Sequence, residues 1–375
     1  MLISSNFDSG SIDVIDAKNP SDVRLGILRD HPSEWYQWFH FRVSGVSGVS
    51  CKFTIEKANK TAFPEGWEHY NVCASYDREN WFRIPSNYDG EALSWSITPE
   101  YDSIYFAYYV PYSMERHLDL IAECSMSSLV KPQVLGHSLD GQDIDLLEVG
   151  HGLEGRKPVW FIARQHPGES MSQWWMEGAL ERLLDEDDPV ARKLLEKAQF
   201  YIVPNMNPDG ARRGQLRTNA AGTPLNREWL NPSMERSPEV YVTREKMEKT
   251  GVNFFIDMHG DEGLPYCFAA GFEGIPNLKQ KRIEQFYKFR HTLAKLCPDF
   301  QVVHGYDSDG PGEANMNMAL NYVADHFDAV TMIMETPFQD NHDLPKLKEG
   351  GFSTDRCRHL ARGSLAAILQ IIDEL

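Results

Sequence analysis

The chain has 375 residues, of which 42% are hydrophobic and 25% charged, and its formal net charge is −18. This length predicts two or three folding units with sizeable cores. The excess of acidic groups argues against a broad surface for nucleic acid or anionic membranes, so we expect neither partner.

The first ten residues, MLISSNFDSG, lack the basic segment and apolar stretch of a secretory signal, and no apolar run reaches the roughly 20 residues of a membrane span. The six cysteines are far apart and form no CxxC pair. We therefore expect reduced, mostly buried thiols in a soluble, cytoplasmic protein. The cysteines are Cys51, Cys73, Cys124, Cys267, Cys297 and Cys357.

Residues 1–115 contain short aromatic and β-branched runs, such as CKFTIEKA, LSWSI and SIYFAYYV, separated by Gly, Pro, Asn and Asp. This pattern predicts an all-β antiparallel sandwich domain. One aromatic cluster is expected to be part of its core rather than a binding patch. That cluster comprises Trp35, Tyr36, Trp38, Phe39 and Phe41.

Residues 116–375 show a different sequence pattern, in which apolar runs alternate with helical stretches. Runs this apolar suit strands covered on both faces, so we predict an α/β domain. The expected strands cover 159–163, 200–204, 254–258 and 330–334, and the expected helices cover about 170–187, 276–298 and 355–374.

The motif HPGE, residues 166–169, follows the first of these strands. Ligand sites of open α/β sheets gather where strands end. His166 and Glu169 could offer a metal ion one imidazole and one carboxylate, and catalytic zinc sites commonly use three protein ligands. The motif alone is a weak signal, so a third ligand must come from elsewhere.

The motif DMHG, residues 257–260, places His259 at the end of another apolar strand. A lone histidine is more often a structural residue, but two such strand ends together favour a metal site. Asp257 could orient the His259 ring. Glu335 follows the strand VTMIM, where it could pair with an arginine or act as a general base.

The segment NPDGARRGQLRTNAAGTPLNREW, residues 207–229, carries four arginines. The adjacent Asn226 and Arg227 suit a carboxylate held by two hydrogen bonds. A solvated basic loop is the alternative, and it describes Arg212 and Arg213 better than Arg217 or Arg227.

In this order, HPGE, NPDG, LNREW, DMHG and METPF resemble the carboxypeptidase A-like zinc peptidases. The closer resemblance is to the cytosolic carboxypeptidase subfamily, in which a β-sandwich precedes the peptidase domain. It implies a mixed sheet of about eight strands between helices. It also implies one zinc ion per chain, held by His166, Glu169 and His259.

The same resemblance implies that Asn226 and Arg227 bind the terminal carboxylate of a peptide or protein substrate. Arg217 would stabilise the oxyanion, and Glu335 would be the general base toward a metal-activated water. Members of the subfamily remove glutamates, so acidic C-termini are a candidate substrate.

Two positions depart from the family pattern. Pro224 stands where an aspartate often orients the first zinc histidine, which leaves the partner of His166 open. Neither Tyr306 nor Tyr322 can be assigned to substrate from spacing, and packing is the expected role of both.

Two other functions are alternatives to peptide hydrolysis. A zinc deacylase of N-acyl amino acids, similar to aspartoacylase, shares the HxxE, His and Glu arrangement, although the preceding sandwich argues against it. A non-catalytic binding protein with a decayed peptidase domain is the other alternative, although every principal position is filled.

Overall fold

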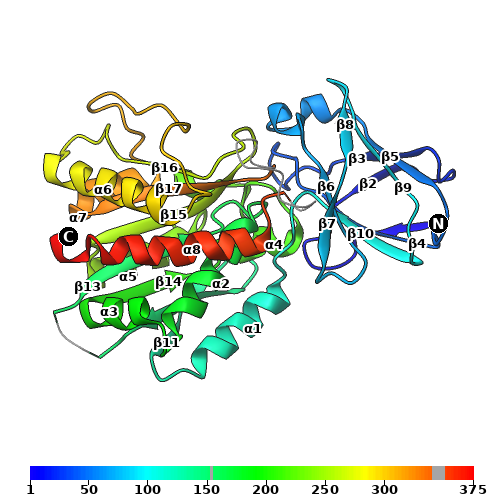
Figure 1. Ribbon diagram of the computed structural model, residues 1–375. Coiled ribbons are helices and arrows are strands. Elements are labelled where there is room, and N and C mark those ends of the chain that lie inside the picture. The colour runs from blue at the N-terminus through cyan, green and yellow to red at the C-terminus, as the bar shows by residue number, and fades with distance from the viewer. Residues whose placement is uncertain (153–154, 340–350) are drawn as a thin grey trace.

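The computed structural model describes residues 1–152, 155–339 and 351–375. Figure 1 shows an all-β N-terminal part beside a larger part in which helices enclose a sheet. This arrangement confirms the predicted fold class, an α/β domain preceded by an all-β domain.

The N-terminal part contains two five-stranded sheets. One has the order β1-β4-β10-β6-β7, and the other has the order β2-β3-β5-β9-β8. All neighbouring strands run antiparallel except β3 and β5, which are parallel. The strands are β1 (Leu2–Ser4), β2 (Asp13–Asp16), β3 (Val23–Gly26), β4 (His40–Ser44), β5 (Cys51–Ile55), β6 (Val72–Ser75), β7 (Trp81–Ile84), β8 (Ser86–Tyr88), β9 (Leu93–Ile97) and β10 (Ser103–Ala107).

Aromatic rings fill the space between these two sheets. Phe106 on β10 lies 5.0 Å from Phe53 on β5 and 5.6 Å from Trp95 on β9, measured between ring centroids. Phe41 on β4 lies 6.3 Å from Phe53. Because these contacts join one sheet to the other, the domain is a sandwich with an aromatic core.

The prediction that five aromatic residues all belong to this core is wrong for two of them. Trp38, Phe39 and Phe41 are buried, but Trp35 is 36% exposed and Tyr36 is only half-buried. The strand begins only at His40, so the preceding residues form a loop. Trp38 and Phe39 at its end enter the core, whereas Trp35 packs against Arg217 of the other domain.

The second domain is built on a seven-stranded sheet of order β11-β12-β14-β13-β15-β17-β16. Strands β14, β13, β15 and β17 are parallel, and the outer strands are antiparallel to their neighbours. The strands are β11 (Val130–His137), β12 (Asp143–Val149), β13 (Lys157–Ala163), β14 (Ala198–Val203), β15 (Phe254–Asp261), β16 (Phe268–Ala270) and β17 (Val330–Pro337).

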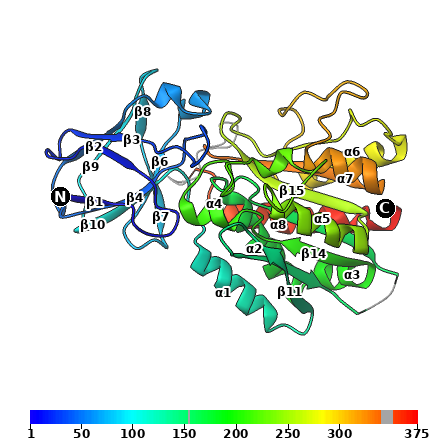
Figure 2. The same ribbon diagram turned by 180° about the vertical axis from the view of Figure 1, so that it is seen from behind.

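Helices cover both faces of this sheet (Figures 1 and 2). Side chains alternate along β13, so that Phe161 joins the core under α2 and α8 while Trp160 joins the core on the opposite face. The helices are α1 (Met114–Ser125), α2 (Met171–Leu183), α3 (Pro189–Lys197), α4 (Pro208–Arg213), α5 (Pro238–Thr250), α6 (Gln280–Leu296), α7 (Ala319–Phe327) and α8 (Thr354–Leu369). The three predicted helices correspond to α2, α6 and α8.

Seven strands are one fewer than the resemblance implies. In the described ranges, the chain between β16 and β17 pairs only through one isolated bridge, from Phe300 to Cys267. The chain that follows contains Gly305, Gly310, Pro311 and Gly312. Glycine and proline disfavour continued strand pairing, so an eighth strand does not extend there.

The two domains are joined by the segment between β10 and α1, and we propose the domain boundary near residue 115, at the start of α1. Ser113 caps α1 by accepting a hydrogen bond from the Arg116 backbone N–H. Arg83 of the sandwich donates to the carbonyl oxygen of Phe338 at 2.9 Å. Tyr109 donates to that of Phe352 at 2.7 Å. Backbone atoms of the second domain are therefore fixed by side chains of the first.

All six cysteines are buried, as the sequence predicted for most of them. A helix with the length and apolarity to span a membrane is absent from the described ranges.

Candidate active site

The four parallel strands place their carboxyl ends at one edge of the sheet, where ligand sites of such folds form. His166 follows β13, and His259 lies near the end of β15. Glu335 lies near the end of β17 and is paired in register with His259. The three motifs named by the sequence therefore meet at this edge.

His166, Glu169 and His259 form a buried cluster whose ligand atoms all lie within 4.8 Å of one another. Glu169 lies between the two rings. Its Oε1 is 2.5 Å from Nδ1 of His166, and its Oε2 is 2.8 Å from Nδ1 of His259. Both imidazoles thus turn the same nitrogen toward one carboxylate.

The loop that carries His166 is held from within by Arg164, which is buried. Arg164 has a φ of 60°, in the left-handed region that a non-glycine residue rarely adopts. Its Nε donates to the Pro167 carbonyl at 2.9 Å, and its Nη1 donates to the Tyr112 carbonyl at 2.7 Å. Because several contacts fix it, this unusual conformation is maintained beside the site.

His259 is supported by a chain of polar side chains on the side away from Glu169. Its Nε2 lies 3.0 Å from Oδ1 of Asp257, at ion-pair distance although not aligned as a hydrogen bond. Asp257 Oδ2 accepts from Gln165 at 2.6 Å, and Gln165 accepts from the Trp229 indole at 2.8 Å. Asp257 thus occupies the orienting position that the sequence suggested.

His166 has no comparable support. Its Nε2 is buried and has no hydrogen-bond partner within the described ranges. Pro224, two positions before Asn226, has no polar side-chain atom to offer. His166 Nε2 thus differs from His259 Nε2, which has an Asp257 oxygen 3.0 Å away.

The charges of the cluster are strongly coupled. Burial lowers the pKa of His166 to about 4. Burial alone would raise the pKa of Glu169, but the two imidazoles hold it below its usual range. Burial alone would likewise lower the pKa of His259, but Asp257 and Glu169 raise it well above its usual value. Two imidazole nitrogens and one carboxylate are a ligand set that suits catalytic zinc, so these residues fit that ion.

Glu335 is 5% exposed, and burial raises its pKa well above its ordinary value. Its Oε1 accepts a hydrogen bond from the Tyr306 hydroxyl at 3.1 Å. Its Oε2 is buried and has no hydrogen-bond partner in the described part of the chain. One oxygen of this carboxyl group is therefore available to another molecule.

Of the two candidate tyrosines, the structure brings only Tyr306 to the site. Its hydroxyl contacts both Glu335 and, at 2.5 Å, Asp261 Oδ2. Tyr322 instead bonds to Arg244 and packs in the core beneath α5 and α7. Tyr306 packs its ring against Phe268, as expected, but it is 49% exposed and its hydroxyl also makes these two polar contacts.

The predicted substrate residues lie around the same cluster. Asn226 is buried, and its Oδ1 has no hydrogen-bond partner among the described residues. Burial lowers the pKa of Arg227, and the charge of Arg217 lowers it further. The charge of Arg217 also lowers the pKa of His166. The two guanidinium groups are therefore close enough for their charges to act on each other or on the cluster. Together they could attract an anion.

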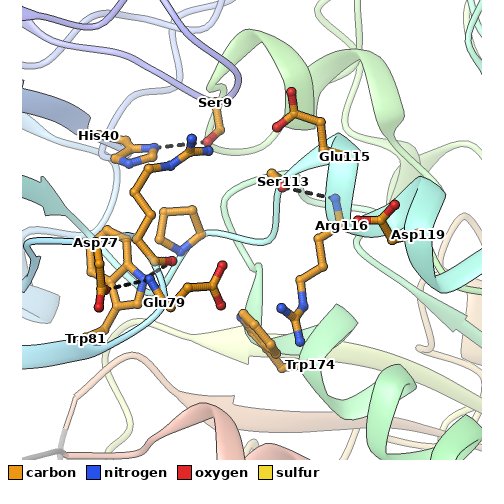
Figure 3. A pocket seen from close by; sticks show the side chains of 12 residues that line it. Ser9, His40, Asp77, Glu79, Trp81, Ser113, Glu115, Arg116, Asp119 and Trp174 are labelled. Atoms are coloured by element: carbon orange, nitrogen blue, oxygen red, sulfur yellow. Dashed lines mark hydrogen bonds between the residues drawn. The ribbon is translucent and has the colours of Figure 1, made fainter.

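A separate cavity of about 250 Å³ lies between the two domains. Figure 3 shows Ser9 and His40 of the sandwich on one side, and Arg116 and Trp174 of the second domain on the other. His40 Nδ1 lies 3.0 Å from the Ser9 hydroxyl, and burial lowers the pKa of His40 to about 3. This cavity contains none of the predicted site residues.

Two family models match the chain. Residues 3–109 match the cytosolic carboxypeptidase N-terminal domain, and residues 114–267 match the zinc carboxypeptidase domain. The structure of a metallo-carboxypeptidase from Pseudomonas aeruginosa is 44% identical, covers 100% of both chains and superimposes with a TM-score of 0.97. The chain belongs to the zinc carboxypeptidase family.

Other relatives of this zinc carboxypeptidase are named cytosolic carboxypeptidases. Cytosolic carboxypeptidase 6 of Caenorhabditis elegans is 29% identical over 330 residues, which cover 80% of this chain and 71% of that protein. Cytosolic carboxypeptidase 3 of Bos taurus is 27% identical over 333 residues, which cover 80% of this chain but only 33% of that protein. These relatives confirm the subfamily and a hydrolase, and nothing in them supports the deacylase alternative.

Several residues that shape the site of this zinc carboxypeptidase were missed by sequence reasoning. Arg164 and Gln165 directly precede the HPGE motif, so their position was a signal that could have been used. Asp30 and Trp35 lie more than 100 residues before any motif, and no local pattern marks them. Their contribution depends on how the two domains pack.

Proposed function

We propose that this zinc carboxypeptidase removes the last residue of peptides or proteins, with one zinc ion per chain held by His166, Glu169 and His259. The observation that carries the proposal is the convergence of two imidazoles and a carboxylate beside a carboxyl group with a free oxygen. When bound, zinc would polarise the scissile carbonyl and acidify a water molecule.

Glu335 would act as the general base. Its unpartnered Oε2 can accept a proton from water, and its raised pKa suits a group that must then give the proton to the leaving amine. The burial of the carboxyl group keeps competing water away from it. Proton uptake and release thus fall to the same side chain.

Asn226 and Arg227 would bind the terminal carboxylate, and Arg217 would stabilise the oxyanion that forms as the carbonyl is attacked. A carboxylate could occupy the position facing the unpartnered Asn226 and the half-buried Arg227. An internal peptide bond offers no carboxylate there. The enzyme would therefore act only at chain ends.

The side chain of the terminal residue would enter a cavity of about 380 Å³ bordered by Tyr306 and by Ile333, two residues before Glu335. Arg290 lines this cavity, and its Nε is buried with no hydrogen-bond partner in the described ranges. Burial lowers the pKa of Arg290, which reflects the cost of a desolvated cation. A carboxylate side chain would relieve that cost, so we propose that acidic C-termini are preferred.

A basic terminal residue is the second candidate, and two observations favour it. Glu273, Asp307 and Asp309 line the same cavity. The P. aeruginosa relative is described in complex with (2-guanidinoethylmercapto)succinic acid, which carries a guanidino group. If the negative charge of these carboxylates exceeds the effect of the Arg290 cation, the cavity would select a terminal lysine or arginine.

We also propose that the protein works in the cytoplasm. Support comes from the relatives named cytosolic carboxypeptidases. We expect peptide or protein C-termini as its substrates.

The test uses peptides that differ only in the last residue, with glutamate, lysine, alanine or phenylalanine, each with a free or an amidated C-terminus. We expect free C-termini to be cleaved, amidated ones to resist, and a chelator to stop the reaction. Cleavage of amidated peptides at equal rates would refute the role of Asn226 and Arg227. Among the peptides with a free C-terminus, fastest cleavage after glutamate supports a preference for acidic residues set by Arg290. Fastest cleavage after lysine supports the second candidate, a preference for basic residues.

A further inference from the structure

The segment that carries Arg217 is attached to the N-terminal sandwich through the side chain of Asp30. The backbone N–H groups of Leu216, Arg217 and Thr218 donate to the Asp30 carboxylate at 2.7, 2.8 and 3.0 Å. The Thr218 hydroxyl donates to it at 3.1 Å. Asp30 is 2% exposed. A buried carboxylate that accepts this many hydrogen bonds fixes the path of the backbone from which Arg217 extends.

The guanidinium of Arg217 rests on two aromatic rings of the sandwich. Its Cζ lies 4.7 Å from the ring centroid of Trp35 and 5.6 Å from that of Phe63. The two rings are themselves stacked, with centroids 5.9 Å apart and an interplanar angle of 26°. A cation held against an aromatic face is attracted by the ring and loses freedom to rotate.

Phe63 is held in turn by a residue of the sandwich core. Its backbone N–H donates to Gln37 Oε1 at 2.7 Å, and its carbonyl accepts from Gln37 Nε2 at 3.0 Å. Gln37 is fully buried. The ring pair under Arg217 is therefore anchored to a rigid part of the neighbouring domain.

The hydrogen-bonding edge of Arg217 is left unused by this arrangement. Within the ranges that the structure describes, the buried Nε of Arg217 has no hydrogen-bond partner. Stacking engages the flat face of a guanidinium and leaves its N–H groups free in the plane. Arg217 is thus oriented by its face while its donors remain available.

We propose that the N-terminal sandwich completes the catalytic site, with Trp35, Phe63 and Asp30 as positioning residues that hold Arg217 for the transition state. This inference rests on the oxyanion role proposed above for Arg217. It assigns the sandwich a part in the reaction in addition to its packing. It also explains why Trp35 and the loop around it lie outside the sandwich core.

The test is a double-mutant cycle between Trp35 and Arg217 in the full-length, zinc-loaded enzyme. Trp35→Leu removes the aromatic face, Trp35→Phe keeps one, and Arg217→Ala removes the cation. Tyr101→Leu is the matched control, because Tyr101 is an exposed aromatic residue of the same domain that packs against Tyr76. Each variant is measured for kcat, KM, zinc content and melting temperature.

We expect Arg217→Ala to lower kcat by about 100-fold or more, as loss of an oxyanion donor does. We expect Trp35→Leu to lower kcat by about tenfold with KM little changed, in line with the strength of a partly buried cation–π contact. Trp35→Phe should recover most of the loss, and Tyr101→Leu should match the wild type. In the Arg217→Ala background, Trp35→Leu should have no further effect.

The outcomes separate the two proposals. If Arg217→Ala costs activity while Trp35→Leu does not, the positioning role is refuted and the oxyanion role stands. A Trp35→Leu loss that persists in the Arg217→Ala background also refutes positioning through Arg217. If Arg217→Ala is fully active, the oxyanion role fails, and this inference fails with it.

A second measurement addresses Asp30 without using activity. In Asp30→Asn, hydrogen exchange of the amides of residues 216–218 should become faster, because the replacement offers one oxygen where the carboxylate offers two. Unchanged exchange at these three amides in a folded variant would refute the anchoring role of Asp30.

Discussion

The hydroxyl of Tyr306 lies 3.1 Å from Glu335 Oε1 and 2.5 Å from Asp261 Oδ2. A phenol has a single hydrogen to donate, so the two carboxyl groups share one donor. Glu335 is thus restrained on one oxygen and free on the other. This relationship connects the segment between α6 and α7 directly to the proposed base.

Glu335→Gln should abolish turnover while leaving the metal site intact. The amide cannot take up a proton, and Glu335 is not one of the three residues of the metal cluster. We expect kcat to fall by at least about 100-fold. Peptide hydrolysis and zinc content of the purified variant provide the check. A variant that retains zinc and cleaves at a normal rate would show that another group is the base.

Tyr306→Phe should move the acidic limb of the kcat/KM profile to higher pH. The hydrogen bond from Tyr306 favours the ionised form of Glu335 and lowers its pKa, so its loss raises that pKa. The base is then protonated over a wider range of low pH. Tyr322→Phe is the matched control, because the Tyr322 hydroxyl bonds to Arg244 and not to Glu335. An unshifted limb in Tyr306→Phe would mean that this hydrogen bond is absent in the working enzyme.

Removal of metal should lower the melting temperature as well as activity. A ligand that binds only the folded state stabilises it, by about 4 kcal/mol at a thousandfold excess over its Kd. We expect a chelator to lower the melting temperature of the wild type and added zinc to restore it. In His166→Ala, which lacks one of the three cluster ligands, the chelator should have little effect. An equal response in both proteins would place the metal elsewhere.

Glu239→Gln should make stability less dependent on pH. Burial raises the pKa of Glu239 from 4.5 to about 8, so the folded state keeps a proton that the unfolded state loses. This contribution is fully present below about pH 4.5 and is lost as the pH rises to about 8. The loss is at most about 1.4 kcal/mol per pH unit. A neutral glutamine removes this pH dependence. The free energy of unfolding of the variant should therefore rise relative to that of the wild type as the pH increases across this range.

Urea unfolding at several pH values between 5 and 9 measures this difference. Glu245→Gln is the control, since Glu245 is exposed on the same helix, and its difference from the wild type should stay constant. A constant difference for Glu239→Gln would mean that Glu239 is ionised in the folded protein at neutral pH.

The strands that carry the site could be predicted because each is a buried apolar run that ends in a motif. A parallel sheet brings the carboxyl ends of its strands together. The positions of His166, His259 and Glu335 are therefore set by the strands that they follow or end. The surroundings of Arg217 could not be predicted in this way. Its contacts with Asp30 and Trp35 join residues more than 180 positions apart, and they depend on a loop whose path is set only when the domains pack.

Tyr306 illustrates the same limit within one domain. Its segment has no periodic pattern, and its hydroxyl reaches Glu335 only because the loop folds back over β17. For Trp35 the pattern of hydrophobic residues predicts a core position, because it cannot distinguish a strand from an aromatic loop that packs on a neighbouring domain.

The pairing of His259 with Glu335 limits how this protein can change during evolution. In a β-ladder the register pairs each residue of one strand with one residue of the next, and successive side chains point to opposite faces. Inserting or deleting one residue within β17 would turn Glu335 to the far face of the sheet, whereas the loops beyond the strand ends are free of that constraint. This chain can therefore accept changes in the length of those loops more readily than changes in the spacing along these two strands.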